Sequence, residues 1–80
     1  MLVVLKPEVK RIRNGYSATS PELRLSAHGF SPESAKFNLE AAVRMFFQPF
    51  ARAGTLDEEI RLAGVHVSEQ GGVGLTVTCE

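Results

Sequence analysis

Residues 15–34 concentrate the side-chain types that hydrolytic enzymes use as nucleophile and base. They include one histidine, His28, and a series of hydroxyl side chains at Ser17, Thr19, Ser20, Ser26, Ser31 and Ser34. A nucleophilic site needs a hydroxyl or thiol within hydrogen-bond reach of a base that a third group orients. Several of these hydroxyls have a structural explanation, because Ser20 precedes a proline at a turn, Ser31 precedes one at a helix start, and Ser26 falls on the polar face of a strand. We therefore assign no catalytic residue here.

The remaining reactive groups are also explained by local structure. No acidic residue lies within three positions of His28 to activate it, and His66 sits between two valines in a strand-like context. The acidic run 57–59 falls at a helix start, where the helix dipole accounts for it. Cys79 is the only cysteine, so an internal disulfide is impossible. Together with His28 and His66 it does not form the ligand spacing of any recognised zinc site. The sequence predicts no enzyme activity, metal or cofactor.

Length and composition predict one small domain spanning residues 1–80. A chain of this size buries only about 60% of the surface that its unfolded form exposes, which leaves room for one core. Its formal net charge of zero argues against direct binding to nucleic acid. The apolar run 2–5 is too short for a signal peptide or a membrane span. A cytoplasmic protein without membrane association is expected.

Strand signals fill the first third of the chain. Residues 2–5 are rich in β-branched and leucine side chains, and Pro7 then marks an edge or a bend. Asn14 and Gly15 suit a two-residue hairpin turn that would pair Arg13 with Tyr16. The pattern does not decide which face of this hairpin is buried. Residues 23–28 then alternate apolar and polar side chains, which predicts a third strand with one face in water.

A long helix is predicted to begin at Ser31, which can cap free backbone N–H groups, with Pro32 in the first helical position. Pro49 should end or kink this helix near Gln48, and Gly54 is a natural final stop. At 100° per residue, one apolar stripe faces the sheet. Its members are Ala35, Leu39, Ala42, Val43, Phe46 and Phe50.

A second, shorter helix and further strands complete the chain. Thr55 and Glu58 stand at capping-box spacing, and Gly64 is a terminator. Residues 65–67 suit a brief strand, the glycine-rich segment 69–72 a turn, and residues 73–79 a closing strand. The predicted fold class is α+β, a two-layer sandwich with a mostly antiparallel sheet and one long helix on one face, in the order β-β-β-α-α-β.

The long helix also carries apolar side chains away from its stripe. Phe37 lies about 160° from the stripe centre, with Ala41 and Met45 nearby and Phe47 flanking the stripe. We interpret this as a second apolar surface for the short helix, a partner protein or a second copy in a homodimer. The acidic run of the short helix would complement a basic partner. The predicted interface residues are Phe37, Met45, Phe47, Asp57, Glu58 and Glu59.

Residues 15–47 resemble the HicB-like antitoxin family. The shared pattern is a Gly-aromatic hairpin, a Pro-Glu-Leu turn, a strand ending at glycine, a serine or threonine cap, and a helix with the spacing Ala-x-x-Asn-Leu-x-x-Ala-Val. Its positions here are Gly15, Tyr16, Pro21, Glu22, Leu23, Gly29, Ser31, Ala35, Asn38, Leu39, Ala42 and Val43.

The resemblance implies a non-catalytic protein that binds and masks a small, basic, mRNA-cleaving toxin of the HicA type. Many members also carry a C-terminal DNA-binding segment, for which residues 55–80 offer no pattern. Two alternatives remain open. The chain could be an orphan, self-associating structural or accessory domain without a toxin, or a nuclease-like enzyme that uses His28.

Overall fold

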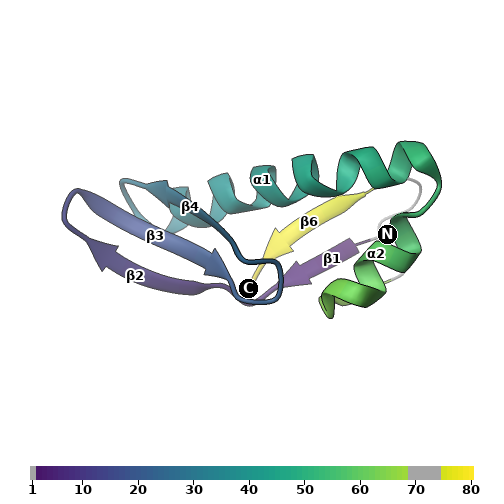
Figure 1. The fold of residues 1–80 in the computed structure, drawn as a ribbon. Helices are drawn as coiled ribbons and strands as arrows, with labels where there is room; N and C mark the ends of the chain where they lie inside the picture. Colours follow the sequence, from purple (N-terminus) through teal and green to yellow (C-terminus); the bar gives the residue numbers. More distant parts are fainter. Residues whose placement is uncertain (1, 69–74) are drawn as a thin grey trace.

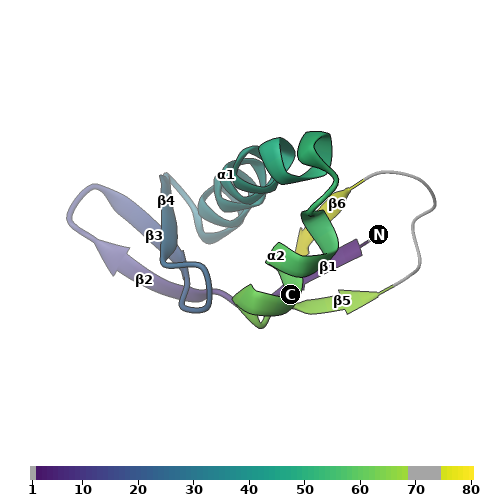
Figure 2. The same cartoon turned by 45° about the vertical axis from the view of Figure 1, so that its right-hand side comes forward.

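The computed structural model describes residues 2–68 and 75–80 and has the α+β fold that the sequence predicts (Figure 1). Helix α1 lies along one side of the strands, and α2 turns back beneath its C-terminal end (Figure 1, Figure 2). The predicted turn at 69–72 and the first two residues of the predicted closing strand, Val73 and Gly74, lie outside the described residues. The elements in chain order are β1 (Leu2–Leu5), β2 (Glu8–Ile12), β3 (Gly15–Ser20), β4 (Leu25–Gly29), α1 (Pro32–Ala53), α2 (Leu56–Ala63), β5 (His66–Ser68) and β6 (Thr76–Cys79).

The strands divide into two three-stranded sheets, whereas the sequence predicted a single sheet. One sheet has the order β2-β3-β4 and is antiparallel throughout. The other has the order β5-β1-β6, with β1 antiparallel to β5 and parallel to β6. The division falls at Lys6 and Pro7, between β1 and β2. Proline has no N–H to donate to a ladder, so one long strand here becomes two short ones.

The β2–β3 hairpin turns one residue earlier than predicted. Ile12 pairs with Gly15 and Arg11 with Tyr16, so Arg13 and Asn14 form the connection and Gly15 already belongs to β3. The register also settles which face of the hairpin is buried. Val9 packs against the core, whereas the side chain of Ile12 is exposed.

Helix α1 begins as the sequence predicts. The Ser31 side chain accepts a hydrogen bond of 3.1 Å from the backbone N–H of Ser34, and Pro32 occupies the first turn. Of the two outcomes predicted at Pro49, an end or a kink, the end near Gln48 does not occur, because the helix continues through Pro49 to Ala53. Packing outweighs the proline penalty here, since Phe47 and Phe50 on either side of Pro49 both contact the core.

The end of α1 is formed by Gly54, which adopts a φ of 79° in the left-handed region. The sequence predicted this final stop correctly. Its N–H donates to the Ala51 carbonyl, and the Thr55 N–H donates to the Phe50 carbonyl. Glycine reaches this conformation without the Cβ clash that other residues incur.

The hydrophobic core lies between α1 and the two sheets. Its helical part is a single row of four buried residues spaced four apart, and the strands and α2 supply the rest. The buried apolar residues are Ala35, Leu39, Val43 and Phe47 on α1, Val3, Leu5, Ala18 and Val77 on strands, and Ile60 on α2.

The buried row corrects the predicted stripe at two aromatic positions. Phe47 has no exposed surface, whereas Phe46 is 40% exposed. Strand β6 approaches the flank of α1 that carries Glu40, whose carboxylate accepts a hydrogen bond from the backbone of Cys79. Phe47 follows Glu40 by seven residues, or two helical turns, and therefore lies on the same flank. The core turns toward β6 and includes Phe47 in place of Phe46.

Helix α2 has the predicted position but not the predicted cap. The Thr55 side chain makes no capping hydrogen bond, although its backbone carbonyl accepts one of 3.1 Å from the Glu59 N–H. Gly64, with a φ of 74°, ends the helix as predicted. Neither helix combines the length and the apolar character needed to cross a membrane.

Candidate functional site

Two hydroxyl groups of the stretch 15–34 make local hydrogen bonds. The buried Ser20 hydroxyl donates to the Glu22 carboxylate at 3.2 Å, and the Ser31 hydroxyl caps α1. Ser26 and His28 lie exposed on β4, on the polar face that the sequence predicts. Among the residues that the structure describes, no hydrogen bond joins a serine hydroxyl to the His28 imidazole.

Several residues of the HicB-like pattern instead hold β4 against the start of α1. The Asn38 side-chain amide donates a hydrogen bond of 2.7 Å to the His28 carbonyl. Gly29 lies so close to the helix that a Cβ there would meet the Ser34 Cβ at 2.6 Å. A side chain at Gly15 would collide with the Gly29 carbonyl. Asn38 and Gly29 thus have a packing role at the contact between β4 and α1, and Gly15 has one where β3 meets the end of β4.

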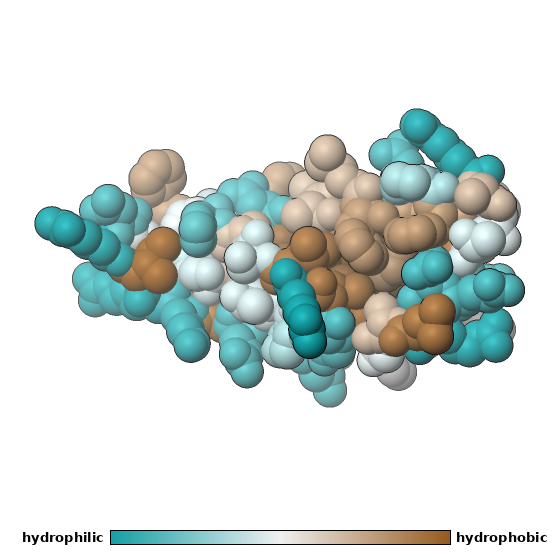
Figure 3. Space-filling view, viewed as in Figure 1, coloured by the Kyte–Doolittle hydropathy of each residue, from teal (hydrophilic) through white to brown (hydrophobic). Residues whose placement is uncertain are grey.

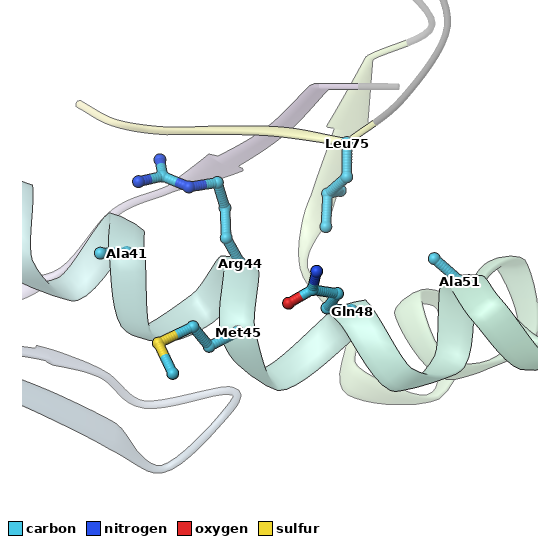
Figure 4. Close-up of a pocket in the computed structure, with 6 residues that line it drawn as sticks. All are labelled: Ala41, Arg44, Met45, Gln48, Ala51 and Leu75. Carbon is cyan, nitrogen blue, oxygen red and sulfur yellow. The ribbon is translucent and has the colours of Figure 1, made fainter.

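The outer face of α1 carries the predicted apolar residues Phe37 and Met45, which are 65% and 72% exposed. Between them in sequence lies Ala41, four residues from each. A pocket of about 440 Å³ opens on the C-terminal side of this face (Figure 4). Its lining residues are Ala41, Arg44, Met45, Gln48, Ala51 and Leu75.

Phe47 does not belong to this surface, which corrects its assignment as an interface residue. Its side chain is fully buried, and its ring meets the Phe46 ring edge to face, with centroids 5.1 Å apart. Phe46, assigned to the core by its position in the stripe, is the one of the two that reaches solvent. Both residues are phenylalanines, so residue type does not indicate which of them is buried. The position of β6 decides it.

A second apolar surface, which we call the side face, lies on the flank of α1 nearest β4. Phe46 follows Asn38 by eight residues on this flank, and the Phe46 ring contacts the Phe50 ring at 5.7 Å between centroids. Figure 3 shows apolar atoms gathered on one side of the molecule, below α1 and between the β2-β3-β4 sheet and α2. This surface was not predicted from the sequence.

Charged groups border the side face at the α2 end. Asp57 and Glu58 are exposed in the first turn of α2, whereas Glu59 is half-buried. The structure therefore places the predicted acidic residues away from Phe37, whose surface is the outer face of α1. Basic side chains of the β2–β3 hairpin lie at the opposite end of a molecule about 40 Å long (Figure 1). Each end also carries the opposite charge, because Arg61 is exposed in the last turn of α2 and Glu8 is exposed on β2.

Phe30 is another exposed residue to which the sequence analysis assigned no role. It precedes the Ser31 cap and is 92% exposed. It borders a pocket of about 250 Å³ at the junction of the hairpin, β4 and the start of α1, together with Ile12, Asn14, His28, Gly29, Ser34 and Asn38. A hydrophobic residue before a cap usually packs back onto its helix, so its exposure could not be predicted from the spacing.

The single cysteine is a structural residue of β6. Its backbone N–H donates a hydrogen bond of 2.8 Å to Glu40, and its Sγ lies 3.6 Å from the Lys36 carbonyl. Burial, together with the neighbouring Glu40 carboxylate, raises the pKa of the Cys79 thiol to about 11. Thiolates are the reactive form of cysteine, so Cys79 is a poor nucleophile at neutral pH.

The described residues contain no group of three or more His, Cys, Asp or Glu side chains arranged to hold a metal ion. What the geometry offers is two apolar surfaces, the outer face of α1 and the side face, with acidic residues beside the second. In comparisons with protein families, curated protein sequences and solved structures, the chain shows no significant match.

Proposed function

We propose that this protein is a non-catalytic protein-binding module of the HicB-like antitoxin kind. Its partner is a small, basic, mRNA-cleaving toxin of the HicA type, which it binds and masks. The observation that carries the proposal is the side face, which includes the partly exposed ring of Phe46 on α1 and is followed in the chain by α2, whose first turn is acidic. A cytoplasmic location follows from such a partner.

The apolar part of the side face supplies binding energy. Aromatic side chains are enriched at the centres of protein interfaces, where they are desolvated in contact with a partner. Phe46 stacks edge to face against both Phe47 and Phe50, so its ring is held by two neighbours before any partner arrives. A side chain that is already ordered loses little conformational entropy on binding.

The acidic residues favour a basic partner. Asp57 and Glu58 are exposed in the first turn of α2, with Arg61 in its last turn, whereas Lys10, Arg11 and Arg13 are exposed in or next to the β2–β3 hairpin. Complementary charge at the rim of an interface accelerates association and excludes like-charged competitors. A basic RNA-cleaving protein fits this rim, and the family resemblance names the same class of partner.

The structural roles of the hydroxyl side chains support a non-catalytic function. Ser20 and Ser31 are engaged in local hydrogen bonds, and the Asn38 amide is bound to β4. A nuclease-like enzyme would instead require His28 to work with a partner group that another molecule supplies. The test below separates the two possibilities.

The experiment is co-expression of the protein with a HicA-type toxin, followed by co-purification and titration of the pure components. Glu58→Lys should weaken binding and reduce its salt dependence, whereas Glu8→Lys, the same charge reversal on the exposed β2 strand, should leave binding unchanged. Phe46→Ser should weaken binding further, with a thermal melt to verify that the variant folds.

Three results would count against this proposal. The protein could fail to bind the toxin, both charge reversals could have equal effects, or the pure protein could cleave RNA in a manner lost in His28→Ala. The first result combined with a stable homo-oligomer would favour the orphan structural domain, and the third would favour the nuclease-like enzyme.

A further inference from the structure

We propose that the outer face of α1 binds a second copy of this chain. The two helices pack antiparallel about a two-fold axis at Ala41, and Phe37 of each copy enters the pocket beside Met45 of the other. This interface is separate from the side face and does not depend on the toxin.

The positions of Phe37, Ala41 and Met45 along α1 define the two-fold axis. Phe37 and Met45 lie four residues before and after Ala41, so they form one row along the helix and are about 12 Å apart along its axis. Rotation about an axis at Ala41 exchanges the two positions. Each copy therefore places Phe37 opposite the second copy's Met45, and the small side chain of Ala41 permits close approach of the helices.

The pocket on this face is suited to the phenyl ring that the rotation brings to it. It has a volume of about 440 Å³ and is lined by Ala41 and Met45, with Arg44 beside them (Figure 4). Phe37 is outside its own copy's pocket lining. The sulfur of Met45 and the guanidinium of Arg44 both interact favourably with aromatic rings. A symmetric dimer fills two such pockets with two otherwise exposed phenylalanines.

The charges of α1 select the antiparallel orientation. The exposed charged residues of the helix are Glu33, before Ala41, and Arg44 and Arg52, after it. Antiparallel packing places the acidic half of each helix beside the basic half of the other, whereas parallel packing would place like charges together. The two basic residues also make this face a poor surface for a basic toxin, which leaves the side face for that partner.

The first test measures the oligomeric state by sedimentation or light scattering across a concentration series. The wild type should be a dimer. Phe37→Asp and Ala41→Glu should each weaken it by at least roughly 30-fold, because both place charge in the desolvated centre. Leu62→Asp, at an exposed leucine on α2, is the matched control and should remain dimeric. A monomeric wild type, or a dimer that survives both substitutions, would overturn the proposal.

The second test determines the geometry by disulfide trapping in a Cys79→Ala background. Ala41→Cys lies on the axis and should cross-link to itself. A mixture of Phe37→Cys and Met45→Cys proteins should give a 37–45 heterodimer, whereas Phe37→Cys alone should not cross-link, because its two copies lie beyond disulfide range. Efficient 37–37 cross-linking without the 37–45 product would show a parallel arrangement and refute the proposed axis. Toxin binding by these variants is measured separately, so each proposal can fail alone.

Discussion

Glu40 in the middle of α1 accepts a hydrogen bond of 2.8 Å from the backbone N–H of Cys79, which lies 39 positions later in the chain. This contact fixes β6 against the helix and turns the buried face of α1 toward Phe47. Glu40 is therefore a structural residue, although a glutamate in the middle of a helix usually faces solvent.

We expect Glu40→Ala to destabilise the fold by about 1.5–3 kcal/mol, because a charge-assisted hydrogen bond is lost and the Cys79 N–H loses its partner. Chemical denaturation measures the loss. Gln48→Ala, at an exposed position of the same helix, serves as the control and should change stability by less than about 0.5 kcal/mol. If the two substitutions lowered stability equally, the hydrogen bond from Cys79 to Glu40 would not be what holds β6 against α1.

Leu39→Ala should cost about 2–5 kcal/mol, since it removes a fully buried side chain from the centre of the core row. A loss of that size can unfold an 80-residue domain, whose total stability is of the same order. Thermal melts of Leu39→Ala and of the milder Leu39→Met provide the comparison. A Leu39→Ala protein as stable as the wild type would contradict the packing described here.

Gly29→Ala should be strongly destabilising, because its new Cβ would lie 2.5 Å from the Ala35 nitrogen and 2.6 Å from the Ser34 Cβ. The backbone of β4 and the first turn of α1 would have to separate, which would also disrupt the Asn38–His28 hydrogen bond. Gly54→Ala is an informative contrast. That position has open space, so its substitution should cost only the roughly 1 kcal/mol of a left-handed alanine. A reversed order in thermal melts would argue against the close strand–helix approach.

Stability should fall in alkaline solution because of Cys79. The pKa of its thiol is about 11 in the folded protein and 9.0 in the reference state, so between these values the folded state binds more protons than the unfolded state. The contribution of the Cys79 thiol to the free energy of unfolding is complete below about pH 9 and is lost as the pH rises through 11. Denaturation from pH 8 to 11 should show a shallower decline for Cys79→Ala than for the wild type, whereas parallel curves would contradict a shifted thiol.

Much of the architecture follows from local sequence signals. Ser31 and Gly54 mark the two ends of α1 because capping depends on residues adjacent in the chain, and the alternation in residues 25–28 identifies the faces of β4 for the same reason. The failures concern tertiary packing. Pro49 stays helical because core contacts on both sides of it outweigh its local penalty. Phe47 is buried where Phe46 was predicted to be, because the buried flank of α1 depends on where β6 lies.

The candidate surfaces were predictable in part. Helical periodicity alone places Phe37 and Met45 on the outer face of α1, and both are exposed. The side face could not be predicted, since it depends on how the β2-β3-β4 sheet and α2 are placed around α1. Whether Asp57 lies near Phe37 or near Phe46 likewise depends on how α2 turns back under α1, which no local pattern encodes.

The parallel pairing of β1 with β6 has a consequence for the order in which the protein forms during synthesis. Residues 2–5 pair with residues 76–79, so β1 cannot gain this neighbour until residues more than 70 positions later have left the ribosome. The β2-β3-β4 sheet and the first part of α1 rely on contacts within residues 8–53 and can form earlier. Non-local pairing of this kind is slow, because a long loop must close before the contacts compensate for its entropy. Until β5 and β6 have both been made, the newly made β1 has neither of its strand neighbours and is an exposed apolar segment of the kind that chaperones recognise.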